Sequence, residues 1–233
     1  MKLRSLVVLI SAFITNFICA QSDTLVVVEA DEKYFEDQFY IGLNYNLLTR
    51  APSDIGQSSF SYNFIVGFIK DLPINRRRNI GFGLGAGLSI SSIYSDLLAD
   101  KDENGNIFYQ EIPDDFSYNR NMLKMNFVEF PIEFRWRNSQ SDNYRFWRIY
   151  SGIKFSYLLS GKSKLVTDTF KFTFDNPDIR NIQYGVYLSF GYNTWNFYAQ
   201  YDLSNVFEDD KFTVDGEALE PRIFKAGLIF YIL

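Results

Sequence analysis

The sequence has no histidine among its 233 residues, and its only cysteine is Cys19. These absences exclude Ser-His and Cys-His nucleophiles, histidine-based acid–base chemistry and His/Cys zinc sites. We therefore expect a protein that is not an enzyme and that has no catalytic residue, metal site or cofactor. Beyond the N-terminal region, no run reaches the roughly 18 apolar residues that a membrane-spanning helix requires.

Aromatic residues are abundant, whereas charge is sparse. The chain has 24 Phe, 16 Tyr and 3 Trp, so that 18% of its residues are aromatic and 22% are charged. Aromatic side chains lose rotamer freedom on a helix and fit a pleated surface better. The composition therefore indicates a folded, mostly β protein.

The N-terminus has the features of an export signal. Lys2 and Arg4 precede an apolar run from Leu6 to Ile18, and small Ala20 follows. This arrangement predicts a cleaved Sec-type signal over residues 1–20. Acylation at Cys19 is the alternative, but Ile18 is too large for the position before a lipoprotein cysteine. Residues 21–37 are then expected to form a periplasmic N-terminal arm.

From residue 38 to residue 233, large apolar residues alternate with small or polar ones. This period of two is typical of strands with one apolar face. Eight such segments occur: 39–47, 60–68, 80–90, 128–136, 147–159, 182–192, 195–203 and 223–233.

The lengths of the strands and connections favour a transmembrane barrel. The segments match tilted membrane strands of about 9 to 11 residues. Long connections alternate with short ones, as in outer-membrane barrels with long extracellular loops and short periplasmic turns. We therefore predict an all-β, eight-stranded antiparallel barrel in the Gram-negative outer membrane, with membrane lipids as partners and no nucleic acid.

A soluble β-sandwich or lipocalin-like barrel also alternates apolar and polar residues, but its large side chains point inward. Here the polar face carries the glycines of segment 81–87, which suits a narrow polar lumen. We therefore expect the apolar face to contact lipid. Its predicted members are Phe64, Leu84, Phe130, Phe155, Leu188, Phe197 and Leu228, whereas Lys225 should point inward.

Two features are expected at the periplasmic end. Trp136, Trp147 and Trp195 lie on the apolar face next to short turns, and indole prefers the membrane–water interface. They predict an aromatic girdle. Arg76, Arg77 and Arg78 occupy another short turn, which is either a solvated turn or a docking site for a partner.

The shortest connection predicts the register of the two strands that it joins. If Asn193 and Thr194 form a two-residue loop, Tyr192 faces Trp195 across the hairpin. Asn accepts the positive φ that such a turn requires.

The predicted lumen contains charged residues on the fourth and fifth barrel strands, namely Glu129, Glu133, Arg135, Arg148 and Lys154. We expect them to form an ion-pair network. Like charges directly opposed across strands are destabilising, so a register that places Arg135 against Arg148 is disfavoured. The predicted register instead places Glu133 against Arg148, with Glu129 diagonal to Lys154.

The segment Phe127-Val-Glu-Phe-Pro-Ile-Glu-Phe-Arg-Trp-Arg137 resembles a strand of the PorT-like outer-membrane β-barrel family, and the segment Phe146 to Tyr157 continues the likeness. The resemblance implies an outer-membrane component of the type IX protein secretion system, which in gliding bacteria also exports adhesins for motility. Its partners would be other outer-membrane and periplasmic subunits. It implies no catalytic residue.

An eight-stranded barrel has an interior that side chains just fill, so a secretion role would lie in assembly or docking of a translocon. The alternative is a stand-alone structural barrel or small-solute channel.

Overall fold

The computed structural model describes residues 37–75, 77–113, 115–138 and 147–232. The predicted signal peptide, the arm up to residue 36 and Arg76 lie outside the described residues. No helix of membrane-spanning length occurs in the described ranges.

Eight long strands carry the fold, in the alternating segments that the sequence predicts. They are β1 (Gln38–Thr49), β2 (Tyr62–Pro73), β3 (Ile80–Tyr94), β6 (Arg120–Arg137), β7 (Trp147–Val166), β9 (Ile182–Tyr192), β10 (Trp195–Asp202) and β11 (Arg222–Ile232). Three short strands lie between them: β4 (Leu97–Lys101), β5 (Ile107–Glu111) and β8 (Lys171–Asp175).

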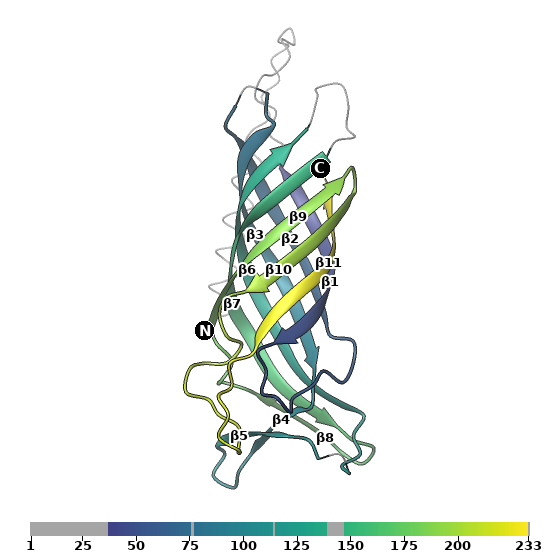
Figure 1. The fold of residues 1–233 in the computed structure, drawn as a ribbon, viewed down its shortest axis with the longest axis vertical. Coiled ribbons are helices and arrows are strands. Elements are labelled where there is room, and N and C mark those ends of the chain that lie inside the picture. Colours follow the sequence, from purple (N-terminus) through teal and green to yellow (C-terminus); the bar gives the residue numbers. More distant parts are fainter. Residues whose placement is uncertain (1–36, 76, 114, 139–146, 233) are drawn as a thin grey trace, which may run out of the picture. The chain divides into compact units, whose positions relative to one another are not determined.

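The eight long strands close into one antiparallel barrel (Figure 1). They follow one another in chain order around the sheet, β11 pairs with β1, and β6 pairs with β7. Every strand edge of the barrel is therefore paired, which removes the open edges that invite aggregation. The predicted fold class is confirmed.

Burial alternates along the strands with a period of two. The apolar residues point outward, and Phe64, Leu84, Phe130, Phe155, Leu188 and Phe197 are between 40% and 58% exposed. Leu228 is also on the outer face and is half-exposed, whereas Lys225 is buried inside. The predicted facing of these residues is correct.

The turn between β9 and β10 has the predicted register. Tyr192 pairs with Trp195 and Phe190 pairs with Phe197, whose rings stack with centroids 5.4 Å apart. Asn193 has a φ of 56°, the left-handed conformation that the two-residue turn requires.

The strands β6 and β7 are longer than the alternation predicted, with 18 and 20 residues. Their ends on the side of the long loops extend beyond the predicted segments, and β8 pairs with the end of β7. The register shifts between Asn126 and Phe127 of β6, opposite Leu158 to Ser160 of β7. This β-bulge reverses which residues of β7 face outward, so the simple period of two ends there.

Parts of the long connections form strands and a buried cluster instead of solvated loops. β4 and β5 form a hairpin at the long-loop end, where β8 also lies (Figure 1). An apolar cluster closes this end of the lumen, and its buried members are Ile93, Ala99, Tyr109, Met125, Phe127, Ile179, Val206, Phe207, Leu219 and Ile223.

Polar contacts fix this loop-end cluster. The Tyr109 hydroxyl lies 3.1 Å from Asn176 Oδ1 and 3.0 Å from Asp178 Oδ2. Burial raises the pKa of the Tyr109 phenol, so the group stays a neutral donor. Lys211 Nζ lies 2.6 Å from Asp178 Oδ1. The loops therefore form a small core of their own at this end of the lumen.

Candidate functional site

The lumen near the short-turn end contains a buried group of charges centred on Arg135. Its guanidinium lies 2.9 Å from Asp71 Oδ1 and 3.1 Å from Glu133 Oε1, and it donates to Gln38 Oε1 at 3.1 Å. The side chains of Arg135, Asp71 and Glu133 are all fully buried. A buried charge is tolerated when it is paired and hydrogen-bonded, and Arg135 meets both conditions.

Asp71 is shared between two arginines. Its Oδ2 lies 2.7 Å from Arg137 Nη2, while its Oδ1 contacts Arg135. Arg137 also donates from Nε to the carbonyl oxygen of Arg78 at 2.6 Å, which ties the end of β6 to the turn after β2. One carboxylate from β2 thereby forms ion pairs with two arginines on β6.

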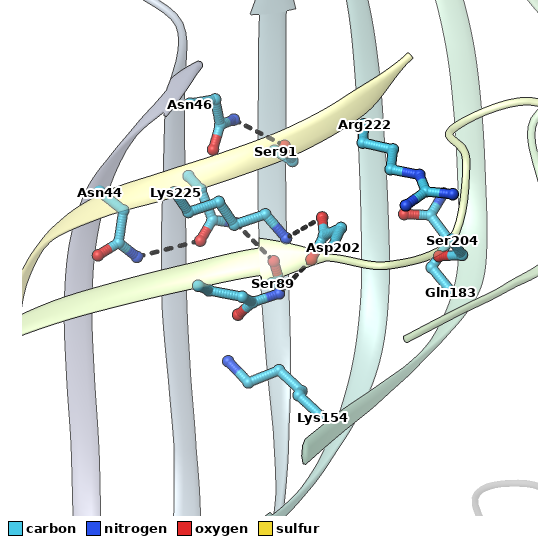
Figure 2. Close-up of polar contacts among 12 residues, drawn as sticks. Asn44, Asn46, Ser89, Ser91, Lys154, Gln183, Asp202, Ser204, Arg222 and Lys225 are labelled. Atoms are coloured by element: carbon cyan, nitrogen blue, oxygen red, sulfur yellow. Dashed lines mark hydrogen bonds and ion pairs between the residues drawn. The ribbon is translucent and has the colours of Figure 1, made fainter. Parts of the chain in front are cut away.

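Two further ion pairs lie deeper in the lumen. Lys154 Nζ is 2.9 Å from Glu129 Oε2 and donates to the Tyr198 hydroxyl at 2.8 Å. Lys225 Nζ is 3.0 Å from Asp202 Oδ2, a contact drawn in Figure 2. Amides and hydroxyls continue the polar lining toward the loops, as in the hydrogen bond from Asn46 Nδ2 to Ser91 Oγ (Figure 2).

Tyrosine rings fill the space between these charges. The buried tyrosines of this part of the lumen are Tyr40, Tyr150, Tyr187, Tyr198 and Tyr231. The Arg135 guanidinium lies 4.6 Å from the centre of the Tyr150 ring, and Arg148 lies 5.7 Å from that of Tyr231. Such cation–π contacts stabilise a charge without a second ion.

Glycines make room for the rings. A methyl group at Gly87 would lie 2.2 Å from the Tyr40 hydroxyl oxygen, and one at Gly67 would lie 2.4 Å from it. The glycines of the polar face therefore accommodate large side chains from other strands.

The predicted register between β6 and β7 is wrong. Glu133 pairs with Gly152 rather than with Arg148, and Arg137 directly opposes Arg148. The avoided pair of Arg135 and Arg148 does not form, but the pair that does form is also one of like charges. Asp71 offsets its repulsion, because its carboxylate forms an ion pair with Arg137. Glu129 and Lys154 are diagonal neighbours and form an ion pair, but in the opposite diagonal direction, because Glu129 opposes Ser156.

Asp71 and Asp202 are lumen residues that were not among the predicted ones. β2 extends through Asp71 to Pro73, beyond the predicted segment 60–68. The alternation was the available signal, because Asp71 follows buried Ile65 and Ile69 in the same phase.

The three tryptophans lie on the outer face near the short turns. Trp136, Trp147 and Trp195 are 38%, 56% and 64% exposed. The ring of Trp147 lies 5.4 Å from that of Tyr192, and the ring of Trp195 lies 5.3 Å from that of Phe230. The side chains thus form an aromatic group at one end of the barrel.

The arrangement offers packing and pairing of buried charges. Within the described ranges, no group of three or more acidic, His or Cys side chains is placed to hold a metal ion. The charged groups of the lumen are buried and contact one another.

Two similar solved structures are crystal structures of Ail, the attachment invasion locus protein of Yersinia pestis. The structure in complex with the heparin analogue sucrose octasulfate has a TM-score of 0.38 and 10% identity, and the match covers 85% of this chain and 99% of that chain. The other has a TM-score of 0.36 and 12% identity, covering 84% and 96%. No functional conclusion follows from similarity at this level.

A comparison with curated proteins finds no match. A protein family described as outer membrane protein beta-barrel domain matches residues 19–208, which is most of the chain. This match agrees with the closed barrel and its apolar outer face. The chain therefore belongs to this family of outer-membrane β-barrel proteins.

Proposed function

We propose that this outer-membrane barrel is a non-catalytic component of the type IX protein secretion machinery, acting in assembly or docking of the translocon. The observation that carries the proposal is the filled lumen. Buried ion pairs and tyrosines occupy the interior of the barrel, and an apolar cluster lies at the loop end. Such a barrel is not a conduit for a protein, so a role in secretion would be exerted through its surfaces.

The resemblance of segment 127–157 to PorT-like proteins supports the secretion system over other roles of outer-membrane barrels. The short turn that contains Arg77 and Arg78 is our candidate for contact with periplasmic subunits. Arg77 is exposed there, while the backbone of Arg78 is held by Arg137.

Deletion of the gene tests the proposal directly. We expect proteins with a C-terminal secretion signal to disappear from the culture supernatant and accumulate in the periplasm, and a gliding host to lose motility. Complementation with the wild-type gene should restore export. Unchanged export in the deletion strain would contradict the proposal and favour a stand-alone barrel.

The proposed docking turn has its own test. Arg77→Glu should reduce recovery of periplasmic subunits when the barrel is pulled down from detergent-solubilised outer membranes, without changing its abundance. Lys211→Gln, at the opposite end of the barrel, is the matched control.

A further inference from the structure

The outer surface of the β6–β7–β8 sheet carries a group of positive charges beyond the apolar belt. Its members are Arg120, Lys124, Lys162, Lys164 and Lys171, which we call the basic face. Lys164 is half-buried and the other four are exposed. Among the described residues of these strands, Asp175 shares this face, 3.3 Å from Lys162 Nζ.

The β-bulge places the lysines on the outside. Between the short-turn end and the bulge, Phe155 and Tyr157 of β7 face outward and Lys154 faces inward. Between the bulge and the loop end, Lys162 and Lys164 face outward, while Ser163 and Leu165 are buried against the loops. The inner side of this sheet is thus covered, and the basic face is fixed toward the surroundings of the barrel.

The basic face contains unfavourable juxtapositions. Lys124 directly opposes Lys162 across the β6–β7 pair, and like charges in this position destabilise a sheet. The pKa of the Lys164 ammonium is lowered by partial burial and by the positive charges of Lys171, Arg120 and Lys124. An anion bound here would relieve this repulsion.

The position of the basic face specifies the source of the anion. Lys162 comes three residues after the exposed apolar residue Leu159, which is about 10 Å along an extended strand. Long loops of outer-membrane barrels face the outside, so the basic face lies at the level of the outer-leaflet headgroups. Lysine and arginine side chains near an apolar belt reach toward such headgroups.

We propose that the basic face binds the phosphate groups of anionic outer-leaflet lipids. The barrel would thereby hold a specific lipid shell on one side, next to β6, β7 and β8. This inference is independent of any role in secretion.

The test measures binding of diphosphoryl lipid A to the protein in neutral detergent, by native mass spectrometry and by the shift in thermal unfolding. Each positive charge removed near an anionic surface should weaken binding about fivefold, so Lys162→Gln/Lys164→Gln should weaken it about 25-fold. This double variant should fold, because it removes like-charge repulsion. Lys124→Gln/Lys171→Gln provides a second, independent pair.

Lys70→Gln is the matched control. Lys70 is an exposed, outward-facing lysine near the short-turn end, where its Nζ lies 3.6 Å from Asp37 Oδ2. We expect it to bind lipid A like the wild type. Equal binding by the basic-face variants, or an equal loss in Lys70→Gln, would overturn the proposal. Displacement of lipid A by equimolar inorganic phosphate would also overturn it, because the site would then recognise free phosphate.

Discussion

Asp71 forms ion pairs with two buried arginines, so its removal should be destabilising. Without this carboxylate, Arg137 would lose this buried ion pair and Arg135 would keep only Glu133 as a buried counter-ion. We expect Asp71→Ala to destabilise the barrel by about 3 to 5 kcal/mol, the usual effect of breaking a buried pair. The midpoint of denaturant unfolding in lipid vesicles measures this loss.

Asp209→Ala is the control for Asp71→Ala. Asp209 pairs with Arg180 in an exposed loop, where an ion pair contributes little. If the two variants unfold at the same denaturant concentration, the lumen charges are solvated rather than buried.

Gly87 is a site at which one methyl group should be destabilising. Its Cβ would lie 2.2 Å from the Tyr40 hydroxyl and 2.7 Å from the Val66 carbonyl oxygen. Overpacking of this kind costs about 1 to 3 kcal/mol, so Gly87→Ala should unfold at lower denaturant. Adding Tyr40→Phe removes the nearer of these atoms and should restore part of the loss. No restoration would show that the backbone contact dominates.

The β9–β10 hairpin depends on one left-handed residue. Asn193 has a positive φ, and a β-branched residue in this region costs about 1 to 2 kcal/mol. We expect Asn193→Val to lower barrel stability by this amount and to slow folding into vesicles. Asn193→Gly should retain wild-type stability, because glycine adopts this conformation freely. Equal stabilities of the two variants would argue against the two-residue turn.

The barrel strands could be predicted from the sequence because their exposed and buried faces alternate, as in Phe39 to Leu47 of β1. The register of β6 and β7 could not, because the arginines of β6 pair with Asp71 of β2, a strand that is hydrogen-bonded to neither β6 nor β7. The alternation of apolar and polar residues indicates which face of the sheet a side chain occupies. It does not indicate which strand that side chain contacts inside the barrel. The loop-end cluster was missed for a related reason, since Ile179 and Phe207 come from loops without periodicity.

The filled lumen makes a prediction for the molecule as a whole. Side chains just fill an eight-stranded barrel, and here they are tied by ion pairs. Reconstituted into planar lipid bilayers, the protein should show no steady ionic conductance, whereas a general porin treated identically should conduct. Stable conductance steps would favour the small-solute channel over a docking component.

The loop-end cluster has a consequence for the order of folding. Its side chains come from residues as distant as Ile93 on β3, Met125 on β6 and Ile223 on β11. β3 and β6 are paired neighbours, but β11 reaches this side of the sheet only through its pairing with β1, which closes the barrel. The complete cluster should therefore be the last part to form. Outer loops would then resist proteases only on completed barrels. Protease resistance of the outer loops on intact cells would thus distinguish mature barrels from assembly intermediates.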